Sequence, residues 1–269
     1  MSGARNSKGE MLYADWAWDR GIGGKTGEAY NQGWRSWKIG AYDGAANSAI
    51  IAGLGSGAVS AVFTTPPTVV PAAGAGPVSY LLGVDLDKDA GKIYSESGVF
   101  TKSAWDFMMA SSTDLSGYKK RNGKLMIVHG VSDPVFSIND TISWWNDLNK
   151  ANNGAAADFV RLFAVPGMNH CGGGPATDQF DAFSALVNWV EKSQPPGDSQ
   201  NPITAWNGPN DTGAYSRPIC KYPDTLTYVS GPITSASSFT CTPQTTDPLM
   251  NAEDALPDRG PSESTKPGQ

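Results

Sequence analysis

The chain of 269 residues has a formal net charge of -6, with 39% hydrophobic and 17% charged residues. This charge argues against nucleic acid as a partner, because binding to phosphates requires a basic face. No apolar run of about 18 residues occurs, so we expect no membrane span. The length allows a substantial core, and thirty-one glycines and nineteen prolines indicate long irregular stretches.

The N-terminal part, residues 1–100, is rich in glycine, alanine and aromatic residues and shows weak periodicity. Typical stretches are "WAWDRGIGG", "WRSWKIG" and "SGAVSAVFTTPPTVVPAAGAGP". Such composition predicts irregular structure with short helices and no regular sheet. From about residue 104 the pattern tightens, and "AWDFMM" (104–109) is predicted to be part of a helix.

A first strand and helix follow. "KLMIV" (124–128) is a short continuous apolar run, as expected for a strand that is buried on both faces. After the loop "HGVSDPVF", Ser137 and Asp140 form a capping pattern, and Gly154 marks the end of the helix. Four apolar residues at helical spacing define its buried face: Ile138, Ile142, Trp145 and Leu148.

A second strand and helix complete the pattern. "FVRLFAV" (159–165) is another buried strand candidate, and "DQFDAFSALVNWVEKS" (178–193) is an amphipathic helix that ends at Pro195. Its apolar face is predicted to contain Phe180, Phe183, Val187 and Val190. Strand, helix, strand and helix in this order predict a parallel sheet covered by helices. Residues 242–269 contain few apolar side chains and are expected to be disordered or loosely attached.

Two candidate catalytic residues follow the two predicted strands. Asp133 lies five residues after the first strand and His170 lies five residues after the second. Because reactive groups of open α/β sheets collect beyond the carboxyl ends of the strands, we expect both at one edge of the sheet. An aspartate followed by a histidine is the second half of the hydrolase order serine, aspartate, histidine. His170 would then be the general base, and Asp133 would orient and stabilise its imidazole.

Other interpretations of these residues stay open. An aspartate in "SDP" often only caps its own turn, and a histidine in a glycine-rich loop is often a surface residue. His129 is a rival base, although its place before Gly130 favours packing or holding the loop. With two histidines and no dense carboxylate cluster around them, a closed zinc site is not expected.

The sequence contains no recognisable nucleophile for this pair. The motif G-x-S-x-G is absent, and the nearest stretch, "GLGSGAV", has Leu54 in place of the first glycine. Its Ser56 also does not lie between a predicted strand and a helix. No earlier strand loop offers an oxyanion hole. We therefore expect the nucleophile of His170 to lie outside this chain.

The chain has three cysteines. Cys220 and Cys241 flank a loop rich in serine, threonine and proline, and a disulfide between them would close it. Cys171 is then left over, as a small buried residue, a free thiol or half of a bond to a partner outside this chain. Its position next to His170 counts against the first of these interpretations.

Three stretches resemble the tannase and feruloyl esterase family of α/β-hydrolases. They are "GKLMIVHGVSDPVFS", "PGMNHCGGGPATDQFDA" and "RPICKYPDTLTYVSG" with the later "FTC", and the resemblance covers about residues 9 to 242. It implies an α/β-hydrolase fold of which this chain contains the C-terminal part of the parallel sheet, with a remnant of an irregular lid. The implied division is a partial lid in 1–100, a hydrolase part in 101–241 and a tail in 242–269.

The resemblance also implies roles for individual residues. Asp133 and His170 match the aspartate and histidine of the family's catalytic triad. Phe136 would line the acyl pocket, and Phe63 would face the aromatic ring of the substrate from the lid. The implied disulfides join Cys220 to Cys241, and Cys171 to a cysteine beside the nucleophile serine, outside this chain.

The implied activity is hydrolysis of aromatic esters that resemble hydroxycinnamates or gallates, with no nucleic acid or membrane as a partner. The family's nucleophile elbow, oxyanion-hole loop and calcium-binding lid loop are not found here, so we expect an inactive chain without cofactor or metal. The start, "MSGARNSKGEMLYADW", lacks a signal peptide, whereas the whole protein would be secreted or periplasmic. Two alternatives are a stand-alone protein that binds aromatic ligands without catalysis, and a serine supplied by another polypeptide.

Overall fold

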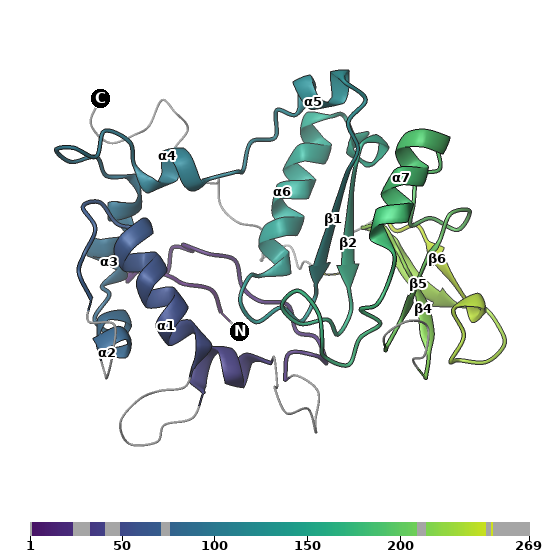
Figure 1. Ribbon diagram of the computed structural model, residues 1–269, viewed down its shortest axis with the longest axis horizontal. Coiled ribbons are helices and arrows are strands. Elements are labelled where there is room, and N and C mark those ends of the chain that lie inside the picture. The colour runs from purple at the N-terminus through teal and green to yellow at the C-terminus, as the bar shows by residue number, and fades with distance from the viewer. Residues whose placement is uncertain are drawn as a thin grey trace. The chain divides into compact units, whose positions relative to one another are not determined.

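The computed structural model describes residues 2–23, 33–40, 49–70, 76–208, 214–245 and 249 (Figure 1). The chain divides into two compact units. The sheet unit consists mainly of Asp15–Gly33 and Ser112–Ala255, and the helical unit consists mainly of Ser2–Ala14 and Trp34–Ser111. The division predicted at residues 100 and 241 stays a prediction, and most of the predicted tail lies outside the described residues.

The helical unit has the short helices that its composition predicts. They are η1 (Arg35–Ile39), α1 (Ile50–Gly57), η2 (Ala58–Val62), α2 (Gly76–Leu82), α3 (Leu86–Asp89), η3 (Ala90–Tyr94) and α4 (Ala104–Met108). Strand pairing in the described part of this unit is limited to isolated bridges. The helix α4 begins at a capping box in which Ser103 and Asp106 bond each other's backbone N–H groups. None of the helices in the described ranges is long and apolar enough to cross a bilayer.

The sheet unit contains the predicted strand–helix–strand–helix pattern. After the short α5 (Ser116–Lys120), β1 (Leu125–Gly130) leads to α6 (Ile138–Ala151), and β2 (Val160–Val165) leads to α7 (Ala182–Lys192). The two strands pair in parallel, from Leu125 opposite Val160 to Gly130 opposite Val165. Figure 1 shows the strand pair between α6 and α7.

The alternation of side chains along the strands divides the core into two layers. On the α6 side, Val160 and Leu162 pack with the predicted face of that helix, and Ile138, Ile142, Trp145 and Leu148 are all buried. On the other side, Phe163 and Val165 pack with Met168, Ala185 and residues of the later strands. The sequence pattern therefore predicted the burial of α6 correctly.

Two predictions about burial are wrong. Residues Leu125 to His129 of β1 are only half-buried, and β2 is the buried strand. Both core layers contact both strands, but β2 has a further backbone neighbour, because Tyr222 N donates to Leu162 O at 2.7 Å. In α7, Phe183 is 77% and Val190 58% exposed, so they do not form the apolar face. This helix begins after the Asp181 cap, and Trp189 is buried instead, with Lys124 and Arg161 against its indole ring.

Two small antiparallel sheets follow α7. The strands β3 (Ile203–Trp206) and β4 (Ser216–Ile219) form one, and β5 (Thr225–Tyr228) and β6 (Phe239–Thr242) form the other. A disulfide joins Cys220 to Cys241, as predicted, with a Cα–Cα distance of 5.4 Å. It links the end of β4 to β6.

Replacing both Cys220 and Cys241 with alanine is expected to lower the free energy of unfolding by about 3 kcal/mol, because the bond closes a loop of moderate length in the unfolded chain. Urea unfolding of the oxidised protein measures this loss. Replacing Cys171, which forms no disulfide in the structure, is the matched control. An equal loss in both variants would show that the disulfide contributes nothing specific.

Candidate active site

The loops after β1 and β2 lie against each other at the carboxyl edge of the strand pair. Val131 N donates to Val165 O, and Ser132 N donates to Met168 O, both at 3.0 Å. Gly130 makes this contact possible, since a Cβ atom there would lie 2.2 Å from the Met168 carbonyl oxygen. The backbone thus brings Asp133 and His170 to the same place.

The side chains of Asp133 and His170 form a hydrogen bond. His170 Nδ1 lies 2.9 Å from Asp133 Oδ2, and because a carboxylate only accepts, Nδ1 carries the proton. The other oxygen, Asp133 Oδ1, accepts from Val135 N at 2.7 Å and Phe136 N at 3.0 Å. The Asp133 side chain is 5% exposed, whereas that of His170 is 24% exposed. This arrangement leaves the Nε2 lone pair of His170 as the proton acceptor.

A segment far away in sequence braces both loops. Asp19 Oδ1 accepts hydrogen bonds from Gly167 N at 2.9 Å and from Ser132 Oγ. Asn169 is fully buried, and its Nδ2 donates to Gly21 O at 2.7 Å and to Ser132 O at 3.1 Å. Asp19 and Asn169 were not predicted from the sequence, because each contacts a residue 148 positions away and no local pattern indicates such a contact.

His129, the rival base, has both ring nitrogens engaged within the protein. Nδ1 lies 2.8 Å from Thr141 Oγ1, and Nε2 lies 3.1 Å from Phe136 O. Its distance to Asp133 Oδ2 is 3.6 Å, longer than that of His170. Burial lowers the pKa of His129, although the charge of Asp133 opposes this shift. The geometry therefore favours His170 as the base.

The lowered pKa of His129 predicts a specific loss of stability in acid. Below the ordinary histidine pKa of 6.5, the unfolded chain binds more protons at this residue than the folded chain does. The free energy of unfolding therefore decreases as the pH is lowered. His129→Gln is expected to lose less stability than the wild type between pH about 7 and about 5 in urea unfolding. Equal losses in the two proteins would contradict this assignment.

The other predicted site residues have different outcomes. Phe136 is 56% exposed, and its ring centroid lies 5.4 Å from that of His170. Phe63 follows η2 in the helical unit, so its predicted contact with substrate stays a prediction. Ser56 lies inside α1, where it is buried and donates to the Gly53 carbonyl.

Cys171 is exposed beside the histidine. Its Sγ lies 3.8 Å from each ring nitrogen of His170, and it forms no disulfide in the structure. The residue has a positive φ of 61°, within a run of glycines that also have positive φ. The loop thus presents the thiol next to the imidazole.

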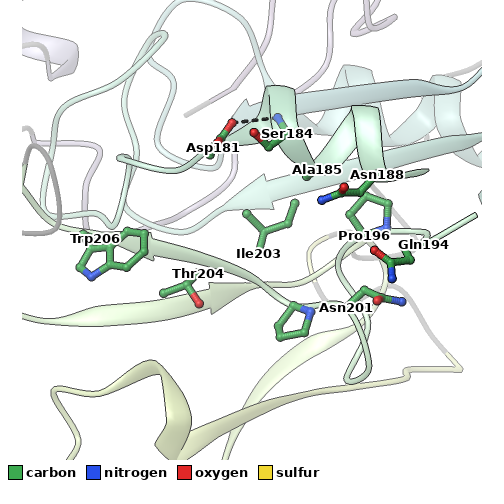
Figure 2. Close-up of a pocket in the computed structure, with 11 residues that line it drawn as sticks. Asp181, Ser184, Ala185, Asn188, Gln194, Pro196, Asn201, Ile203, Thr204 and Trp206 are labelled. Carbon is green, nitrogen blue, oxygen red and sulfur yellow. Dashed lines mark hydrogen bonds between the residues drawn. The ribbon is translucent and has the colours of Figure 1, made fainter. Parts of the chain in front are cut away.

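Two cavities of the sheet unit have walls that include neither Asp133 nor His170. Figure 2 shows one of about 320 Å³ between α7 and β3, with Asn188, Asn201 and Trp206 among its walls. The other, about 360 Å³, lies along β4 and includes Arg20 and Arg217. Within the described residues, no group of three or more histidine, cysteine, aspartate or glutamate side chains is placed to hold a metal ion.

Comparison with known proteins gives the family. The family model described as "Tannase and feruloyl esterase" matches residues 1–242. The chain therefore belongs to the tannase and feruloyl esterase family.

Two curated relatives illustrate the match. The chain is 43% identical over 246 residues to a mono(2-hydroxyethyl) terephthalate hydrolase of Piscinibacter sakaiensis, an alignment that covers 90% of this chain and 40% of the relative. It is 34% identical over 135 residues to a probable feruloyl esterase of Arthroderma benhamiae, an alignment that covers 49% of this chain and 25% of the relative. The crystal structure of feruloyl esterase B from Aspergillus oryzae matches with 22% identity and a TM-score of 0.43, covering 68% of this chain and 44% of that one. This chain thus spans less than half the length of each.

Proposed function

We propose that this chain supplies the acid–base pair of a serine ester hydrolase that acts on esters of aromatic acids. The observation that carries the proposal is the 2.9 Å hydrogen bond between His170 Nδ1 and Asp133 Oδ2 at the carboxyl edge of parallel strands. Membership of an esterase family supports the type of reaction.

In the proposed reaction, His170 Nε2 takes the proton of a serine hydroxyl as its oxygen attacks the ester carbonyl. The imidazolium then gives this proton to the leaving alcohol, and an acyl-serine forms. His170 then takes a proton from a water molecule as its oxygen attacks the acyl-serine, and returns that proton to the serine oxygen. This step releases the acid and restores the serine. Asp133 holds the tautomer and stabilises the imidazolium charge throughout.

We further propose that the nucleophile serine lies outside these 269 residues. The serines on the loop after β1 are engaged elsewhere: Ser132 is fully buried and donates to Asp19, and Ser137 donates to the Asp15 carbonyl. The chain also spans only 40% of the terephthalate relative. Cys171, exposed beside His170, is a suitable partner for a cysteine next to that serine.

An aromatic acyl group is proposed from Phe136. Its half-exposed ring lies against His170, beside the proposed base, and aromatic rings favour tilted or offset contacts with each other. The names of the relatives, a terephthalate hydrolase and a feruloyl esterase, also refer to aromatic acids. Phe63 is proposed as a second contact. Secretion of the whole protein is proposed from the Cys220–Cys241 disulfide, since such bonds persist in oxidising compartments.

The test compares two proteins on a benzoyl and an acetyl ester of the same alcohol. One is the 269-residue chain, and the other is encoded by the coding sequence extended upstream to include a Cys-Ser nucleophile elbow. The extended protein is expected to cleave both esters with a preference for benzoyl, and the shorter chain neither. Binding of an aromatic ligand without turnover by both proteins would favour the non-catalytic alternative. Recovery of activity on mixing the shorter chain with a separate N-terminal half would favour a serine from another polypeptide.

A further inference from the structure

We propose that His129 is a positioning residue that stays neutral and holds the loop carrying Asp133 and Phe136 against His170. The proposal rests on the proposed function of the Asp133–His170 pair. It is carried by three hydrogen bonds. His129 bonds the Phe136 carbonyl and the Thr141 hydroxyl, and the Phe136 N–H bonds Asp133. Together they join β1, the following loop and the first turns of α6.

The contacts of His129 define its tautomer. Nε2 lies 3.1 Å from the Phe136 carbonyl oxygen, which can only accept, so Nε2 carries the proton. In a neutral ring, Nδ1 is then an acceptor, and the Thr141 hydroxyl at 2.8 Å donates to it. His129 is a strand residue, and Thr141 is a residue of α6, so this ring bridges two regular elements to the loop between them.

These bonds fix the peptide groups on both sides of Phe136. The Phe136 N–H donates to Asp133 Oδ1 at 3.0 Å, and the Phe136 carbonyl accepts from His129 at 3.1 Å. Because both backbone groups of Phe136 are held, its phenyl ring is kept in place, with its centroid 5.4 Å from that of the His170 imidazole. The bond to Asp133 Oδ1 also orients the carboxylate so that Oδ2 meets His170. His129 thus acts on the catalytic pair through the loop.

Protonation of His129 would disturb this arrangement. It would turn Nδ1 into a second donor toward Thr141 and place a cation 3.6 Å from Asp133 Oδ2, in competition with His170. The titratable groups around His129 are Asp133, His170 and Asp140. Burial exceeds the opposing effect of the carboxylates and lowers the pKa of His129, which keeps the ring neutral near pH 7.

The first test needs no mutation for its main result. The chain has only two histidines, so ¹⁵N NMR of the imidazole groups gives two sets of signals, and His129→Gln assigns them. At neutral pH the His129 signals are expected to show a protonated Nε2 and an unprotonated Nδ1. A proton on Nδ1, or a charged ring at neutral pH, would overturn the proposal.

The second test uses a matched pair of variants. The amide of His129→Gln reaches the position of Nε2 and keeps a donor for the Phe136 carbonyl. The amide of His129→Asn reaches only the position of Nδ1 and keeps a partner for Thr141. We expect the nuclear Overhauser contact between the Phe136 and His170 rings to persist in the Gln variant and to be lost in the Asn variant.

Persistence of that contact in His129→Asn would overturn the positioning role. If the Asn variant fails to fold, the tautomer of the wild-type ring still decides the proposal. Both measurements are made without substrate, so they do not depend on catalytic activity. Inactivity of the upstream-extended protein, together with the expected tautomer and ring contact, would count against the proposed function alone. Activity of that protein with the opposite tautomer would count against this inference alone.

Discussion

Replacing Asp133 with asparagine is expected to lower kcat for the proposed ester cleavage by the upstream-extended protein about 10⁴-fold, with little change in KM. The asparagine keeps the shape of the side chain, and its carbonyl oxygen still accepts from Val135 and Phe136. Its amide group, however, donates toward His170 Nδ1. The imidazole must then carry its proton on Nε2, where it cannot accept the serine proton.

Steady-state kinetics on a benzoyl ester measures this effect. The control is Asp181→Asn, which changes the exposed cap of α7, a residue that lies outside the proposed machinery. We expect kcat of the control to equal that of the wild type. If Asp133→Asn retained kcat within about tenfold of the wild type, Asp133 would not be the residue that sets the tautomer.

Replacing Gly130 with alanine is expected to lower the free energy of unfolding by about 3 kcal/mol. The added Cβ would lie 2.2 Å from Met168 O and 2.6 Å from Asn169 O. Both atoms belong to the backbone of the loop that carries His170, so the two loops must separate. Activity is expected to fall with stability, because the separation lengthens the Asp133–His170 contact.

Gly117→Ala in α5 is the matched control for this substitution. A Cβ there meets nothing within 4 Å, and alanine favours a helix by about 1 kcal/mol over glycine. Urea unfolding is therefore expected to show a loss for Gly130→Ala and a small gain or no change for Gly117→Ala. Equal stability of the two variants would contradict the close approach of the loops.

The sequence was sufficient to predict the centre of the site because that centre depends on local rules. Two apolar runs separated by one helix form parallel strands, and parallel strands bring the loops after them to one edge. Asp133 and His170 needed no further information to be placed together, and the Cys220–Cys241 bond closes a local loop in the same way.

Features that depend on distant residues could not be predicted in this way. Asp19 supports the two loops from 113 and 148 positions away in the chain, and short-range periodicity does not indicate such contacts. The predicted apolar face of α7 was also wrong. Trp189 is buried with Lys124 and Arg161 against its ring, and Phe183, which lies on a different face of the helix, is exposed. Only the tertiary structure identifies these partners.

We propose that Asp133 and His170 activate a serine that lies outside these residues. Labelling of the upstream-extended protein with a fluorophosphonate, followed by mass spectrometry, tests this most directly, since the reagent reacts preferentially with an activated serine oxygen. We expect one labelled serine, upstream of the 269-residue sequence, and loss of the label in His170→Ala. A label on a serine within the sequence, or a label that persists without His170, would contradict it.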